Sequence, residues 1–418
     1  MIPFFEVGVV YAVVVSLYTL YPLVGYVVNG LGYTFFNDQR LFQTQPAPQE
    51  IGTVGWYHVV HLLSFVTVYL LVRGRLPREQ ARPPRPDGTT WLFVIALYLA
   101  ISGFLLVLNL SFDLSASTYS ETYLVSRRLP LFLAQLFNHL DGARFTCLLA
   151  ILVMLFGNYH KYRWLILGVL ALTALTTFQR LGSRTELMLS LLSAALLYHF
   201  WVRPIPFRVI ALAGLAGLSM FVLLGLLRGG QSLGGLGLAF NPFAHASEFE
   251  SVFANAYDLS RLKAMGAVGD LPPTFYLTDL AALVPQQLVP FTKISPSVWY
   301  VNTFYPEYAA TGGGFAFGTI SESVLGAGWV DLAARGGALG LILAGLQRYM
   351  ATHRPTFWSF VFQVWVTVLV YQSFRNTTFS LLVLFFYRFL PVVVGARLLS
   401  AFLKGSVRRL PRSIPEHA

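Results

Sequence analysis

The sequence predicts an all-α, polytopic integral membrane protein, and three observations lead to this prediction. Hydrophobic residues make up 56% of the 418 residues, whereas charged residues make up only 11%. The mean hydropathy is +0.63. Apolar runs long enough to cross about 30 Å of hydrocarbon as helices recur along the whole chain, so a separate soluble domain of ordinary size has no room. We therefore expect residues 1–418 to form one membrane domain with about ten transmembrane helices.

The expected helices follow the apolar runs in order. The first run has neither a basic start nor a small-residue cleavage site, so we expect a retained membrane helix and not a signal peptide. The short segment 129–140 contains Asn138 and His139, and it either lies in the interface or lengthens the fourth helix. The full set is 5–29, 53–72, 91–110, 143–157, 164–180, 184–202, 207–227, 320–346, 356–374 and 379–403.

Basic residues between these helices indicate how the chain crosses the membrane. If both termini are cytoplasmic, every cytoplasmic connection carries Lys or Arg, including the arginine-rich, proline-containing loop 73–88. The net charge of +11 is then explained by topology, and nucleic acid is not an expected partner. Three longer connections, 30–52, 111–142 and 228–319, face outward. The last is a large external loop between the seventh and eighth helices, and we expect the working surface on this side.

Several chemistries lack the residues that they need. The chain has no glycine-rich loop followed by Lys and Ser or Thr, which disfavours ATP-driven transport, and no G-x-S-x-G elbow for a covalent nucleophile. Cys147 is a lone thiol within an apolar run and is more simply a core residue. His58 and His61 share a helix face but have no evident third metal ligand, so we expect ordinary hydrogen-bonded histidines.

Four arginines stand out because they lie at the outward ends of expected helices, where positive charge is normally scarce. They are Arg180, Arg184, Arg228 and Arg375. Each can snorkel to lipid headgroups on its own. Together they can converge on one phosphorylated ligand, because the planar guanidinium binds phosphate oxygens through two hydrogen bonds and stays charged. We therefore expect an anionic ligand at the outer membrane boundary.

The stretch from Val284 to Asp331 is a polar, turn-rich island between apolar runs. It resembles the oligosaccharide repeat unit polymerases, the Wzy-type O-antigen polymerase family. In that family a stretch with proline and lysine leads to a glycine-rich run, then to a glutamate that opens a late helix, with a glycine soon after. The positions that carry the resemblance are Pro285, Lys293, Ser297, Trp299, the run Gly312 to Phe317, Glu322 and Gly326. Asp331 and Arg335 depart from the pattern, and their spacing predicts an ion pair on one helix face.

The resemblance implies a GT-C-like, metal-independent membrane glycosyltransferase without a cofactor, in the bacterial inner membrane and with its active site on the periplasmic side. It implies transfer of a glycan from undecaprenyl diphosphate onto the non-reducing end of an incoming lipid-linked unit. The implied partners are undecaprenyl-diphosphate-linked oligosaccharides, membrane lipids and a Wzz-type chain-length regulator. We expect diphosphate binding by Arg180, Arg184, Arg228, Lys293 and Arg375.

The acceptor hydroxyl in such a reaction needs a base, and the sequence offers several candidates. Glu322 and Glu307 flank the glycine run, and His245 lies in the same external loop. Glu322 can instead serve only the helix dipole, and Glu307 can be an exposed loop carboxylate. We expect the sugar to meet a substrate loop, whose aromatic residues can equally be interfacial anchors. This loop comprises Gly312, Gly313, Gly314, Trp299 and Tyr300.

Three other functions fit parts of the same pattern. An O-antigen ligase shares the donor and the arginines but uses a lipid A core as acceptor. A lipid-linked oligosaccharide flippase is a transporter, for which we expect repeated halves and broken helices at mid-membrane. A noncatalytic scaffold for other polysaccharide enzymes gives the arginines no necessary role.

Overall fold

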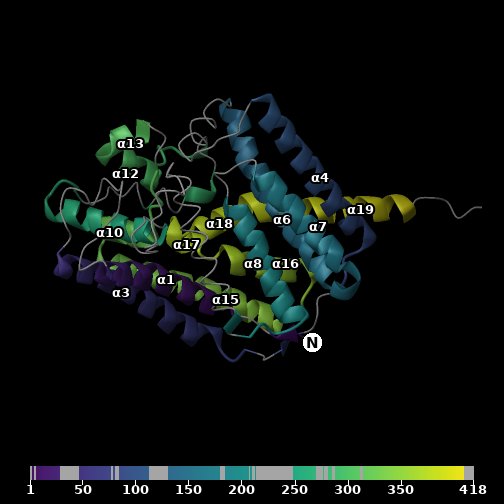
Figure 1. Cartoon of the computed structure of the whole chain (residues 1–418), viewed down its shortest axis with the longest axis horizontal. Coiled ribbons are helices and arrows are strands. Elements are labelled where there is room, and N and C mark those ends of the chain that lie inside the picture. The colour runs from purple at the N-terminus through teal and green to yellow at the C-terminus, as the bar shows by residue number, and fades with distance from the viewer. Residues whose placement is uncertain are drawn as a thin grey trace, which may run out of the picture.

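The apolar runs form long helices (Figure 1). Within the part of the chain that the structure describes, six helices have the length and composition that a membrane span requires. In the computed structural model these spans are Val7–Val28, Pro48–Arg73, Gly88–Leu108, His139–Phe156, Trp329–Thr352 and Ser380–Leu403. Two shorter apolar helices, Leu187–Trp201 and Phe357–Leu369, lie among them. The protein is therefore an all-α membrane protein, as the hydropathy predicts.

The structure describes residues 2–3, 6–28, 47–76, 79–80, 84–112, 130–178, 184–206, 208–209, 212, 248–269, 276, 281–284, 288–310 and 314–408. The expected helix at 207–227 lies outside these ranges apart from isolated residues. Two short strands, β1 (Ile2–Pro3) and β2 (Glu79–Gln80), pair antiparallel, with Ile2 opposite Gln80.

The helices of the first half are mostly membrane spans, and those of the second half are shorter and more interrupted. The first half contains α1 (Val7–Val28), α3 (Pro48–Arg73), α4 (Gly88–Ser111), α6 (Leu131–Phe156), α7 (Tyr159–Phe178) and α8 (Arg184–Trp201). The second half contains α10 (Glu248–Ala264), η2 (Ala281–Leu283), α12 (Pro296–Phe304), α13 (Pro306–Ala310), α14 (Thr319–Leu325), α15 (Trp329–Thr352), α16 (Phe357–Leu369), α17 (Gln372–Arg375), α18 (Ser380–Leu384), the π-helix η4 (Phe385–Phe389) and α19 (Leu390–Arg408).

Several expected elements differ from the observed ones. Segment 129–140 lengthens the fourth helix, because α6 runs without a break from Leu131. The expected helix 320–346 divides into α14 and α15 at a turn in which Gly328 has a φ of +61°, a conformation that suits glycine. The expected helix 356–374 ends early at Leu369, and α17 follows it. These interruptions all lie near the candidate site.

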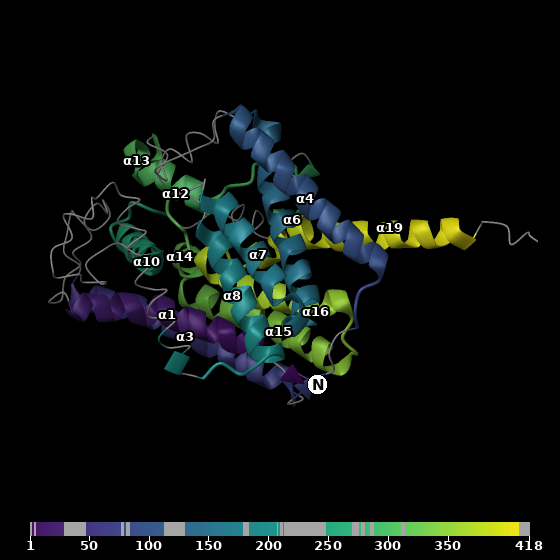
Figure 2. The ribbon, with the colours of Figure 1, turned by 45° about the vertical axis from the view of Figure 1, so that its right-hand side comes forward.

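The external loop predicted at 228–319 contains helices of its own. In both ribbon views α10, α12 and α13 lie on the same side of the molecule, and α10 packs against α1 (Figure 2). Tyr257 of α10 donates a hydrogen bond to Glu50 of α3 at 3.3 Å, and Asn255 donates to the carbonyl oxygens of Ala316 and Phe317 at 2.5 and 3.2 Å. The amphipathic α10 thus connects the loop to the membrane helices.

The helices α3 and α15 make the most extensive helix–helix contact in the described part of the chain. Glycines at a spacing of four, Gly336 and Gly340, allow it, because their missing side chains let the α3 backbone approach closely. A Cβ atom on Gly340 would lie 2.6 Å from the carbonyl oxygen of Phe65, and one on Gly336 would collide with that of His61. The polar face of α3 turns toward α1, where Thr19 and Tyr11 hydrogen-bond to His58 and His61 at 2.9 and 2.8 Å.

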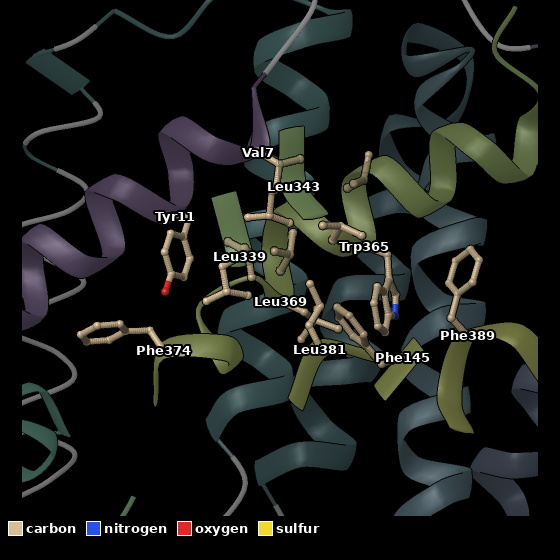
Figure 3. Packing of buried hydrophobic residues seen from close by; sticks show 14 of the residues in the cluster. Val7, Tyr11, Phe145, Leu339, Leu343, Trp365, Leu369, Phe374, Leu381 and Phe389 are labelled. Atoms are coloured by element: carbon tan, nitrogen blue, oxygen red, sulfur yellow. The ribbon is translucent and has the colours of Figure 1, made fainter. Parts of the chain in front are cut away.

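Buried apolar side chains from distant helices meet at the centre of the bundle. Trp365 of α16 is fully buried and lies beside Leu369 and Phe145, with Leu381 and Phe389 close by (Figure 3). Because α16 is buried on nearly every side, it positions α17 at its end with little freedom.

The close contact of α3 with α15 predicts that Gly340→Ala destabilises the protein. The new methyl group must displace the α3 backbone, which costs about 1–3 kcal/mol in a well-packed interface. We expect a lower unfolding temperature of the purified protein in detergent. The matched control is Gly345→Ala on the same helix, where nothing lies within 4 Å of the added Cβ. Equal unfolding temperatures for the two variants would contradict the packing argument.

Candidate functional site

Side chains of α14 form hydrogen bonds to the short helix α17, which ends with Arg375, and to the segment that follows it. Thr319 donates a hydrogen bond to the carbonyl oxygen of Ser373 at 2.6 Å, just before Arg375. Glu322 accepts from the backbone N–H and from the hydroxyl of Thr378 at 3.1 and 3.0 Å, just after it. Side chains one helical turn apart on α14 therefore fix the turn that presents Arg375.

Glu322 also belongs to a buried ion cluster. Arg335 donates to Glu322 at 2.8 Å, to Asp331 at 3.1 Å and to the Thr378 hydroxyl at 2.9 Å. The side chains of Glu322 and Arg335 are only 1% and 6% exposed. The predicted pair of Asp331 and Arg335 is confirmed, while the link to Glu322 crosses the break between α14 and α15 and could not be read from spacing. Paired charges with several hydrogen bonds are the form in which buried ions are tolerated.

The external loop closes over this cluster. Lys263 of α10 donates to the carbonyl oxygens of Val324 and Gly326 at 3.1 and 3.0 Å, at the end of α14. The ring of Tyr276 lies 5.9 Å from the Arg335 guanidinium carbon. A Cβ on Gly326 would lie 2.5 Å from a carboxylate oxygen of Asp331. This contact explains why a glycine follows Glu322 in the external motif.

A cavity of about 280 Å³ lies beside α17, whose last residue is Arg375. Its walls combine charged and amide side chains with apolar ones. The lining residues are Asp141, Gly142, Phe145, Leu189, Trp365, Leu369, Gln372, Arg375, Asn376, Leu384 and Arg388. Arg375 donates to Asn376 at 3.2 Å, and Asn376 donates to Gln372 at 2.5 Å, so these polar side chains form one connected wall.

Arg388 is the cavity residue that the sequence reasoning missed. It lies in the π-helix η4, within a segment expected to be one regular apolar helix. A π-helical turn is uncommon and occurs often at functional sites. Gly142 of α6 makes room for Arg388, because a Cβ on Gly142 would collide with the arginine side chain, and Thr146 donates to the Arg388 carbonyl oxygen at 3.1 Å. An arginine inside an apolar span was itself a signal for function.

The cavity lies at the end of the bundle where two spans begin. Asp141 and Gly142 follow the start of the span His139–Phe156, and Arg388 lies about two turns into Ser380–Leu403. One side of the cavity therefore lies at the start of an apolar span, and the side that carries Arg388 lies deeper along another. On the expected topology the span His139–Phe156 begins at the outer boundary.

The structure places some of the five predicted diphosphate-binding residues at or near the cavity, and two lie outside the described residues. Arg375 lines the cavity. Arg184 begins α8, which contributes Leu189 to the cavity one to two turns later, although the Arg184 side chain is not among those described. Lys293 donates to the Val284 carbonyl oxygen. The neighbouring Leu283 accepts from Tyr387 at 3.1 Å, so this part of the loop reaches the π-helix that carries Arg388. Arg180 and Arg228 lie outside the described residues.

The predicted bases and substrate loop are also only partly described. Glu322 is buried in the ion cluster, while Glu307 is exposed on α13 and does not line the cavity. Gly314 is exposed, and His245, Gly312 and Gly313 lie outside the described ranges. Their catalytic and substrate roles stay predictions.

The two predicted sugar-facing aromatic residues lie on α12. Tyr300 is fully buried, and its hydroxyl donates to Asp258 of α10 at 2.5 Å. Tyr305 donates to the same carboxylate at 2.6 Å. Trp299 is half-buried and packs edge-on against Phe304. Tyr300 thus holds the loop to α10, and of the two only Trp299 retains exposed ring surface for a ligand.

Comparison of the chain with protein-family models, curated proteins and solved structures yields no match.

The buried ion cluster predicts a large stability difference between two arginine variants. Arg335→Met leaves two buried carboxylates without their cation and should cost about 3–5 kcal/mol. The control is Arg73→Met, because Arg73 pairs with Glu6 at 2.5 Å with both side chains more than a quarter exposed. Loss of such an exposed pair costs at most about 1 kcal/mol.

We expect the triple variant Glu322→Gln, Asp331→Asn, Arg335→Met to recover part of the lost stability, since it removes the uncompensated charge. Thermal unfolding in detergent measures all three proteins. A similar loss of stability in Arg335→Met and Arg73→Met would contradict the cluster's role.

Proposed function

We propose that this chain is a membrane glycosyltransferase that polymerises oligosaccharide repeat units linked to undecaprenyl diphosphate. The observation that carries the proposal is that Arg375 and Arg388 line one cavity, one side of which lies at the start of an apolar span. A lipid-linked diphosphate needs this combination of fixed positive charge and nearby apolar surface. The external motif from Val284 to Asp331 supports the same function through its resemblance to the polymerases.

The cavity suits the headgroup of such a lipid better than a whole soluble ligand. Pockets that enclose drug-sized molecules usually measure about 300–1,000 Å³. At about 280 Å³ the cavity can take a diphosphate while the sugars extend toward the external loop and the prenyl chain extends into the bilayer. The apolar wall of Leu189, Leu369 and Leu384 can contact the first part of the prenyl chain.

Two guanidinium groups at the cavity supply the catalysis that diphosphate departure needs. Negative charge develops on the leaving oxygen, and preorganised arginines stabilise it without a proton transfer to the leaving group. Arginine is suited to this role because its fork binds two phosphate oxygens at once. Arg184, the first residue of α8, is proposed to join them, and Lys293 belongs to the part of the loop that contacts the π-helix through Leu283.

The external loop is the proposed binding surface for the acceptor, the incoming lipid-linked unit. Tyr387, next to Arg388, hydrogen-bonds to Leu283 of the loop and stacks on His139 of α6 at a ring-centroid distance of 5.2 Å. The incoming unit would bind between the loop and this end of the last span. The half-buried Trp299 can stack on a sugar ring.

The proposal includes the finer features expected from the sequence. These are about ten spans in a GT-C-like arrangement, a bacterial inner membrane location, cytoplasmic termini and a periplasmic site. A Wzz-type chain-length regulator is the expected protein partner, and no cofactor is expected.

The proposal predicts that Arg388→Ala abolishes polymerisation. The protein is reconstituted in liposomes with single lipid-linked units that accumulate in cells lacking this gene, and the products are separated by size. Wild type should give a ladder of longer lipid-linked glycans. Arg388→Ala and Arg375→Ala should each slow ladder formation at least about 100-fold, because one transition-state donor is lost.

The matched control is Arg397→Ala, which removes an exposed arginine from α19 outside the cavity. It should leave the ladder unchanged, and Arg388→Lys should restore only part of the activity because lysine lacks the fork. Ladder formation at the wild-type rate in Arg375→Ala and Arg388→Ala would refute the diphosphate site. Headgroup movement across the bilayer without any ladder would indicate a flippase instead.

A further inference from the structure

Among the described residues that line the cavity there is one carboxylate, and the sequence motif did not single it out. Asp141 of α6 lines the same cavity as Arg375 and Arg388. Its Oδ1 atom accepts a hydrogen bond from Arg144 at 3.0 Å, one turn later on the same helix. Asp141 was expected in the external connection before the fourth helix, but the unbroken α6 carries it into the bundle.

Accessibility separates Asp141 from the predicted base Glu322. The Asp141 side chain is 31% exposed and faces the cavity, whereas that of Glu322 is 1% exposed and accepts from Arg335 and Thr378. A general base must come within hydrogen-bond reach of the proton that it removes. An acceptor hydroxyl in the cavity would meet the partly exposed Asp141 carboxylate, but it can reach Glu322 only if the ion cluster opens.

The surroundings of Asp141 fit a positioned base. Arg144 is almost fully buried and holds one carboxylate oxygen in place. Gly142, the next residue, gives space to the Arg388 side chain, and Asp141 and Arg388 line the same cavity. The base would therefore stand beside the groups that receive the leaving diphosphate.

We propose that Asp141 is the catalytic base of the glycosyl transfer, an assignment that rests on the proposed function. The acceptor hydroxyl oxygen forms a bond to the anomeric carbon of the donor, and the bond from that carbon to the diphosphate oxygen breaks. Its electron pair leaves with undecaprenyl diphosphate toward Arg375 and Arg388. The hydroxyl proton passes to the carboxylate of Asp141. Glu322 then serves as a positioning residue that fixes the Arg375 turn.

The test compares Asp141→Asn with wild type in two measurements on the full chain in nanodiscs. The first is binding of undecaprenyl diphosphate, and the second is the ladder rate with lipid-linked units as a function of pH. Asp141→Asn should bind undecaprenyl diphosphate within about threefold of wild type but slow transfer at least about 100-fold. Loss of the acidic limb of the rate profile is expected with it, because no carboxylate remains to be protonated.

Two further variants keep the assignment falsifiable. Asp141→Glu should recover part of the rate. Glu6→Gln is the matched control, since Glu6 is also a partly exposed carboxylate paired with an arginine, where α1 begins and α3 ends. It should leave both the rate and the binding unchanged.

The outcomes distinguish the base assignment from the proposed function. If Asp141→Asn keeps the wild-type rate and pH profile, or loses undecaprenyl diphosphate binding together with transfer, Asp141 is not the base. If wild type binds undecaprenyl diphosphate but forms no ladder, the proposed function fails, and the assignment fails with it.

Discussion

Arg335 lies within a membrane span, where a charge is tolerated only with partners that satisfy it. Its two carboxylates come from different helices, Asp331 from its own and Glu322 from α14 across a glycine turn. Thr378 completes the set from the loop before the last span. One guanidinium thus fixes three segments relative to each other, and the placement of Arg375 depends on this contact.

The same cluster connects the membrane helices with the external loop. Lys263 of α10 caps the end of α14. Asp258 of α10 also binds α12 through Tyr300, and Asn255 binds the carbonyl oxygen of Ala316. The described part of the loop therefore belongs to the site's framework. The cavity with Arg375 and Arg388 lies close to this framework, because α17 is hydrogen-bonded to α14 and Tyr387 to Leu283.

Local signals in the sequence predicted the parts of the fold that depend on hydropathy. The long spans and the pairing of Asp331 with Arg335 follow from apolar length and helical spacing. The scarcity of outward arginine singled out Arg375, which lines the cavity. Contacts between distant segments could not be predicted. The link from Glu322 to Arg335 crosses a helix break, and Arg388 lies on a π-turn whose side chain needs Gly142 from another helix. Composition alone shows neither contact.

The proposed function requires that the cavity bind the diphosphate of a polyprenyl lipid. A structure of the wild-type protein in nanodiscs with undecaprenyl diphosphate will show where the diphosphate binds. We expect density for the two phosphate groups between Arg375 and Arg388, with the prenyl chain leaving along the apolar wall of the cavity. A lipid diphosphate bound elsewhere, with this cavity unchanged, would contradict the account.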